Sequence, residues 1–157
     1  MTPLKRIAGV AALGGTMLIG AGLSAPPAQA AYIVTLMQAG SDVVATGGGT
    51  IDTAGLSFDG DNAVDEGGVN PSKGAISIGP VSSTPIDIYI GFTGPTSFGR
   101  GDLTFADSGS GDMVGIGGLG GGLFVPAGYV SGSPLADSST YANQSFSSLG
   151  VTPGSYV

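Results

Sequence analysis

The fold is decided by the stretch YIVTLMQAGSDVVAT, which occupies residues 32–46. Its first seven residues are mostly β-branched, aromatic or long apolar side chains, which favour strands, and its last four repeat that preference. The Ala-Gly-Ser-Asp segment between the two runs is rich in turn-forming residues. The stretch therefore predicts two antiparallel strands, 32–38 and 43–46, joined as a β-hairpin.

The same pattern of short apolar runs and glycine-rich turns continues along the chain. The three glycines at 47–49 should bend the backbone or mark a close approach of another backbone. The clearest alternation is IDIYIGF at 86–92, which places its three isoleucines and Phe92 on one face, so we expect this strand in the middle of the core. Further strands are expected at 50–51, 56–58, 76–78, 103–105, 113–116, 123–125, 141–146 and 155–157.

Helices have little place in this pattern. No segment beyond residue 31 combines a 3.6-residue apolar period with caps, and the 31 glycines disfavour long helices, so at most residues 145–149 form one helical turn. Residues 59–73, with three Asp and one Glu, read as a polar loop. Many short strands about ten residues apart predict a single all-β domain over 31–157, an antiparallel β-sandwich or jelly-roll-like fold.

Residues 1–30 have the layout of a cleavable signal peptide, with an apolar helix as its centre. Lys5 and Arg6 form the basic head, an uncharged apolar run extends from residue 7 to about 24, and Ala28 and Ala30 supply the small-residue site before Ala31. The alternative is a retained membrane anchor, since the run 7–25 is about as long as a bilayer crossing. Its five glycines and the Pro-Pro break that follows it favour cleavage. We therefore expect a secreted, extracellular or cell-surface protein, held to a membrane only if this segment stays uncleaved.

The mature chain is strongly acidic. All eleven acidic residues lie beyond residue 31, where only Lys73 and Arg100 oppose them, which gives residues 31–157 a net charge of −9. Such a balance argues against nucleic acid and anionic membrane surfaces as partners, because both attract basic patches.

Two residue types are missing altogether. The chain has no cysteine, so an exported domain must hold together without disulfides. It also has no histidine, which removes the usual general base, the commonest metal ligand and the Ser-His-Asp and Cys-His forms of nucleophilic catalysis. The sequence therefore predicts a protein that is not an enzyme and carries no cofactor.

One cluster of oxygen ligands stands out. Asp59, Asp61, Asp65 and Glu66 could in principle hold Ca²⁺ in the expected loop. The cluster departs from an EF-hand because Ala63 replaces the third ligand, a valine stands where glycine is needed, and no Glu closes the twelve-residue loop. A solvated acidic turn is the alternative.

Other motifs point to function only weakly. GIGGLG at 115–120 matches the dinucleotide fingerprint G-x-G-x-x-G, but a β-type run and not a helix follows it. The Arg-Gly-Asp tripeptide at 100–102 is common by chance in a chain of this composition, and Asp107-Ser108-Gly109 lacks a histidine partner. Phe124, Tyr129, Tyr141 and Tyr156 could form an aromatic platform for sugars, although core packing is their commoner use.

Several segments of the mature chain form a recognisable set. They read AYIVTL at 31–36, DVVATG at 42–47, GTID at 49–52, GP at 94–95, SFG at 97–99, SGSGD at 108–112, LFVPAGYVSG at 123–132 and SLGVTPGSYV at 148–157. As a set they resemble the mature part of PEP-CTERM sorting-domain proteins of Gram-negative bacteria. The resemblance covers nearly all of residues 31–157.

The resemblance implies an exported surface or matrix protein of an organism that makes exopolysaccharide. Such proteins usually read on through a Trp-containing strand to a Pro-Glu-Pro motif, a hydrophobic helix and a basic tail, and none of these is in the sequence. We therefore expect either a truncated product or a variant without the sorting anchor, with a last strand missing from the sheet.

The leading expectation is a non-enzymatic structural or adhesive protein of the cell surface or exopolysaccharide matrix, with extracellular polysaccharide or surface proteins as partners. The alternatives are a secreted carbohydrate- or calcium-binding module and an inactive truncated product.

Overall fold

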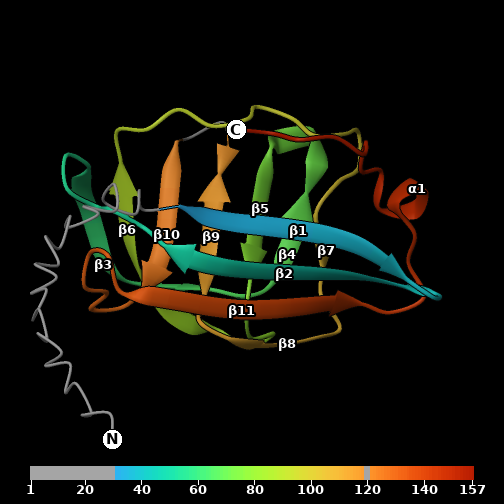
Figure 1. Cartoon of the computed structure of the whole chain (residues 1–157), viewed down its shortest axis with the longest axis horizontal. Helices are drawn as coiled ribbons and strands as arrows, with labels where there is room; N and C mark the ends of the chain where they lie inside the picture. Colours follow the sequence, from blue (N-terminus) through green and yellow to red (C-terminus); the bar gives the residue numbers. More distant parts are fainter. Residues whose placement is uncertain (1–30, 119–120) are drawn as a thin grey trace, which may run out of the picture.

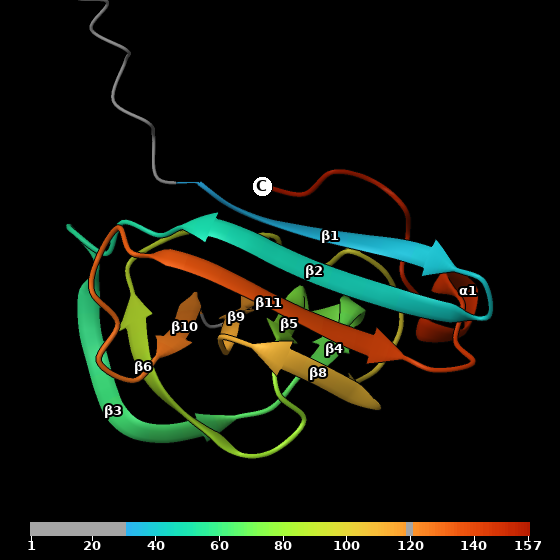
Figure 2. The ribbon, with the colours of Figure 1, turned by 60° about the horizontal axis from the view of Figure 1, so that its bottom comes forward.

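The computed structural model describes residues 31–118 and 121–157, which form two stacked antiparallel sheets. The leader prediction, including Ala28 and Ala30, lies outside the described residues; Ala31 is described, and its carbonyl accepts a hydrogen bond from the Thr50 N–H (3.2 Å). Figure 1 shows the smaller sheet lying across the strands of the larger one, and Figure 2 shows the two layers from a second side. The prediction of an all-β sandwich is confirmed.

The two sheets differ in size. The smaller has the order β1-β2-β11-β8, with bounds β1 (Tyr32–Ala39), β2 (Asp42–Thr50), β11 (Pro134–Tyr141) and β8 (Ser108–Gly111). The larger has the order β3-β6-β10-β9-β5-β4-β7, with bounds β3 (Ser57–Asp65), β6 (Thr84–Ile90), β10 (Gly122–Pro126), β9 (Val114–Gly117), β5 (Ala75–Ile78), β4 (Gly68–Asn70) and β7 (Thr104–Phe105). One 3₁₀ turn, η1 (Pro71–Lys73), and one short helix, α1 (Phe146–Leu149), complete the described elements.

The predicted hairpin is confirmed. Strands β1 and β2 pair in unbroken register from Tyr32 with Gly49 to Ala39 with Asp42, leaving a two-residue turn. The close approach predicted for the glycine run is also present, because a side chain on Gly49 would collide with the Ala31 carbonyl, and its φ of 131° is one that glycine tolerates.

The core lies between the sheets and at one end of them. Val43 and Ala45 of β2 and Tyr141 of β11 point inward from the smaller sheet. From the larger sheet and the connecting segments they meet a set of buried apolar side chains: Val69, Ile76, Ile78, Phe98, Ala106 and Leu149. Burial of side chains of this size contributes about 1.5–3 kcal/mol each, so this cluster is the main source of stability in a chain without disulfides.

The predicted loop at 59–73 is wrong. Residues 57–65 form β3, which pairs with β6 through two register shifts and lies at an edge of the larger sheet. Asp59 and Asp61 are exposed there, so a strand with one solvated side can carry the polar residues that suggested a loop. Strand β4 and the turn η1 occupy most of the remainder.

The alternating strand predicted at 86–92 is confirmed over residues 86–90 as part of β6, which ends at Ile90 and leaves Phe92 outside the strand. Its expected central place is wrong in part. Ile86 is buried, whereas Ile90 is 36 % exposed, because β6 lies second from the edge and its far end leaves the overlap of the two sheets. The alternation therefore identified the strand and overstated its burial.

The end of the chain differs from the expectation. The predicted strand at 141–146 is wrong, since the strand there is β11, which ends at Tyr141, and 155–157 are an exposed tail and not a strand. The predicted turn of helix is confirmed as α1, which Ser145 caps by accepting a hydrogen bond from the Ser148 N–H (3.1 Å). Among the described helices none is long and apolar enough to cross a membrane.

Two tyrosines differ in whether their hydroxyl groups have hydrogen-bond partners. The Tyr141 hydroxyl is fully buried without a hydrogen-bond partner, and burial raises the pKa of its side chain. The Tyr129 hydroxyl, in contrast, donates to the Ser133 carbonyl (2.8 Å) and accepts from the Ile51 N–H (3.1 Å).

We expect Tyr141→Phe to raise the free energy of unfolding by about 1 kcal/mol, because it removes an unsatisfied buried hydroxyl. Its control, Tyr129→Phe, should lower the same quantity by about 1–2 kcal/mol, since it leaves the Ile51 N–H unpaired. Urea denaturation of both variants measures the difference. A loss of stability in Tyr141→Phe equal to that of the control would show that the Tyr141 hydroxyl has a partner in solution.

Candidate functional site

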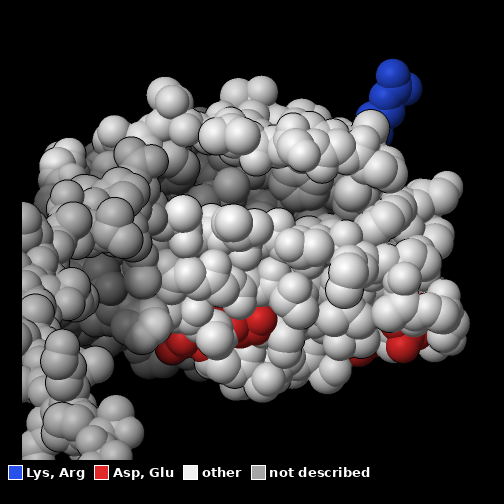
Figure 3. Space-filling model, in the orientation of Figure 1, with Lys and Arg blue, Asp and Glu red and all other residues white. Residues whose placement is uncertain are grey.

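A groove lined by residues of both sheets opens at the surface of the described part of the chain. It has a volume of about 780 Å³ and is open to solvent along the outer side of β1. Figure 3 shows it as a hollow above β1. We refer to it as the edge groove and define it by its main lining segments, 32–36, 92–95, 114–116 and 151–157.

The floor of the edge groove is apolar. Val34 and Leu36 reach it from β1, and Ile76, Ile116 and Leu123 reach it from the larger sheet. None of the described residues that line it is Asp, Glu, Lys or Arg, although the sequence holds eleven acidic residues. The groove is therefore an uncharged, hydrophobic surface on a strongly acidic protein.

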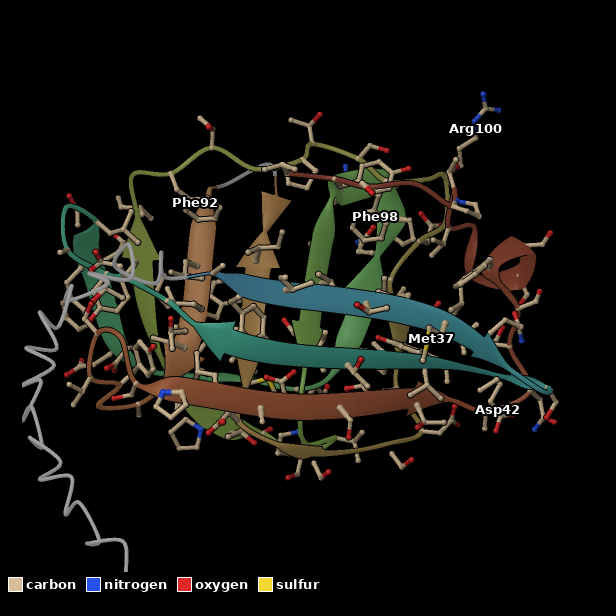
Figure 4. The ribbon with its side chains drawn as sticks, in the orientation of Figure 1. Met37, Asp42, Phe92, Phe98 and Arg100 are labelled. Carbon is tan, nitrogen blue, oxygen red and sulfur yellow. The ribbon has the colours of Figure 1, made fainter. Side chains whose placement is uncertain are left out.

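The side of the groove opposite β1 is built by the segment after β6 and by the C-terminal tail. Phe92 and Phe98 lie along it, whereas Arg100 points away from the molecule (Figure 4). The Tyr156 ring packs against Phe98 with ring centroids 5.9 Å apart, and its hydroxyl donates to the Thr152 carbonyl (2.8 Å). The Thr152 N–H in turn donates to the Phe98 carbonyl (2.9 Å), which ties the tail to this side and leaves β1 free of it.

β1 forms the near side of the groove. Its side chains alternate, so that Tyr32, Val34 and Leu36 are half-buried while Ile33 and Met37 are 66 % and 53 % exposed. Within the described residues β1 pairs with β2 alone and is the edge of its sheet. The side of its backbone that faces away from β2 therefore lies along the opening.

A carboxylate and a phenol meet at one end of the groove. The Tyr32 hydroxyl donates to the Asp137 carboxylate, with distances of 2.7 and 2.6 Å to its two oxygens. Asp137 is only 8 % exposed, and Gly47 lies so close to both groups that a methyl in its place would collide with them. Glycine at this position lets β2 pass beneath the pair.

This environment changes the titration of both groups. The pKa of Asp137 is raised to about 6, mainly by burial and in addition by the nearby Asp112 carboxylate. The hydrogen bonds from the Tyr32 hydroxyl and the Gly47 N–H act in the opposite direction and lower this pKa. Burial and the neighbouring carboxylate raise the pKa of Tyr32 above its ordinary value. The sequence around Asp137 does not predict its contact with Tyr32, because the two residues lie 105 positions apart.

The four acidic residues of the calcium hypothesis lie on and just after β3. Asp65 accepts hydrogen bonds from the Ser77 hydroxyl and from the Glu66 N–H (2.9 Å), and with Glu66 it lines a smaller hollow of about 420 Å³. The described residues contain no group of three or more His, Cys, Asp or Glu side chains that could hold a metal ion. The structure therefore does not bring Asp59, Asp61, Asp65 and Glu66 together as one ligand set.

The remaining motifs are separated or absorbed by the fold. Gly115 and Gly117 lie in β9, which pairs with β10, so the glycine-rich motif belongs to a pair of strands. Tyr141 is in the core and the Tyr129 hydroxyl is bound to backbone, so these two do not join Tyr156 on an aromatic platform. Sequence reasoning missed the edge groove, since its lining comes from six separate parts of the chain.

Comparisons with protein-family models, with curated proteins and with solved structures give no match for this chain.

The Asp137 environment generates a prediction for stability against pH. Because its pKa is about 6 when folded and near 3.8 when unfolded, the folded protein binds more protons between these values, so stability falls as pH rises from about 4 to 6. We expect the loss to be on the order of 2 kcal/mol. Urea denaturation at pH 4.5 and pH 7.5 measures it.

Two variants test whether Asp137 is the group responsible for this pH dependence. Asp137→Asn should remove most of this pH dependence, and Asp112→Asn should move it to lower pH, because one negative neighbour is gone. An unchanged pH profile in Asp137→Asn would contradict the assignment.

Proposed function

We propose that this chain is an exported, non-enzymatic protein that serves as a structural or adhesive component of the cell surface or exopolysaccharide matrix. The leader-like segment 1–30 supports export. The absence of histidine and cysteine from the sequence supports a role in contact and not in catalysis. The observation that carries the proposal is the outer face of the smaller sheet.

That face presents a row of hydroxyl groups. Thr35 pairs with Thr46, Thr46 with Ser138, and Ser138 with Ser110, so that one hydroxyl from each strand lies in register across the sheet. The Ser110 and Ser138 hydroxyls are 3.3 Å apart. We call these four residues the hydroxyl row.

The surroundings of the hydroxyl row suit a neutral hydrated polymer. Neighbouring outward positions are small or apolar, as at Val44, Gly48 and Ala136. Figure 3 shows white surface over the middle of this face, with acidic groups in its lower part. Hydroxyls carried by neighbouring strands, whose backbones lie about 4.8 Å apart, offer repeated hydrogen bonds to the hydroxyls of a polysaccharide.

We expect the protein, exported from a Gram-negative host that makes exopolysaccharide, to sediment with the polysaccharide harvested from that strain. Thr46→Glu should weaken the affinity for the polysaccharide about fivefold, because a lost hydrogen bond of roughly 1 kcal/mol corresponds to that factor in the dissociation constant. Thr96→Glu adds the same charge at an exposed loop position away from the face and serves as the control.

Equal loss of binding in both variants would show a general charge effect and no role for the hydroxyl row. A protein that folds and is exported but does not sediment with the polysaccharide would contradict the proposal and favour an inactive product.

A further inference from the structure

We propose that the free edge of β1 binds an extended, uncharged segment of another exported polypeptide, which lies in the edge groove as an added strand. The inference rests on the function proposed above and deepens it by naming the surface through which this protein contacts a partner and the chemistry of that partner. Strand addition at a sheet edge combines backbone hydrogen bonds for affinity with side-chain pockets for selectivity.

The backbone of β1 is oriented for such pairing. The Ala31 carbonyl accepts from the Thr50 N–H, so odd-numbered residues of the strand direct their N–H and C=O groups toward β2. The even-numbered residues Tyr32, Val34 and Leu36 therefore direct theirs away from β2, along the opening of the edge groove. These groups have the alternation of donors and acceptors that an antiparallel or parallel strand requires.

The edge also lacks the features that protect exposed strands. Sheet edges are usually guarded by charged side chains, proline or a bulge. β1 contains no charged residue and no proline, and its pairing with β2 runs through eight residues without a register shift. The larger sheet differs at its β3 edge, where two register shifts and several acidic residues occur.

The edge groove favours a polypeptide over a purely apolar ligand. A hydrocarbon filling it would cover the free N–H and C=O groups of β1 without bonding them, and each unsatisfied group costs about 1–3 kcal/mol. An extended segment supplies both the hydrogen bonds and the apolar side chains. One extended polypeptide segment would therefore pair with the edge of β1 and fill the edge groove at the same time.

The lining specifies what that segment looks like. Every second side chain of an added strand would point between the sheets, toward Phe98, Ile116 and Leu123, and the others would face solvent beside Ile33 and Met37. Because the lining is uncharged and the protein acidic, inward positions must be apolar and neutral. Residues 32–36 span about 16 Å at about 3.3 Å per residue, which fits a strand of five or six residues.

A labelled peptide tests the proposal on the exported protein. The probe is a nine-residue synthetic peptide in which valine alternates with threonine between terminal lysines, carrying a fluorescent label. We expect its fluorescence anisotropy to rise and saturate with added protein. The matched control has the same sequence with alternate backbone nitrogens methylated, so that one edge cannot donate, and should bind at least about tenfold more weakly.

Substitutions at Val34 place the contact on β1. Val34→Pro removes an N–H that faces the groove and leaves the β1–β2 hydrogen bonds in place, a position at which strands tolerate proline. It should abolish peptide binding. Val34→Ala retains the N–H and loses only part of one apolar contact in the groove, so it should weaken peptide binding without abolishing it. Thermal melts of both variants report whether the fold survives.

Three outcomes overturn the inference. The first is equal binding of the methylated peptide, which would indicate apolar burial alone. The second is undiminished peptide binding by a folded Val34→Pro variant, and the third is self-association of the protein through β1 that excludes the peptide. None of these results affects sedimentation with exopolysaccharide through the hydroxyl row, so failure of this inference and failure of the proposed function are distinguishable.

Discussion

Strand β1 uses only half of its backbone hydrogen-bonding capacity, and the architecture follows from that constraint. On one side it is bound to β2 along its whole length; on the other it borders an apolar groove, and no other strand among the described residues pairs with it there. Buried or half-buried backbone groups need partners, so an edge beside a hydrophobic opening is an incomplete interface. The C-terminal tail does not complete it, because Val151 pairs with Gly99 and the Thr152 N–H donates to the Phe98 carbonyl.

Three of the acidic residues have a structural use. Asp42, Asp107 and Asp112 each accept a hydrogen bond from a backbone N–H distant in sequence, at Asn143, Ala142 and Ala136, with distances of 2.8–2.9 Å. The bond from Asn143 lowers the pKa of Asp42. These carboxylates fix connections around β11 in a protein without cysteine, and they do so at the ends of strands. These three carboxylates therefore lie at strand ends and outside the lining of the edge groove.

The sequence was sufficient for the parts of the fold that depend on local preference. The hairpin at 32–46, the alternation at 86–92 and the helical turn at 145–149 were all visible, since β-branched runs, period-two patterns and caps act within a few residues. β11 was missed because its inward positions include Asp137 and Ser139, which carry no apolar signal. The calcium hypothesis assumed a loop, whereas pairing with β6 draws those residues into a strand. The groove and the Tyr32–Asp137 contact depend on which strands neighbour one another, and that order is not written in any single segment.

The central claim is that β1 is paired on one side only, and amide hydrogen exchange followed residue by residue on the purified protein tests it most directly. The account predicts alternation along the strand: the N–H groups of Ile33, Thr35 and Met37 are protected by β2, whereas those of Val34 and Leu36 exchange quickly. Uniform protection of all five amides, without any added partner, would contradict the account, because it would mean that the edge of β1 is already occupied.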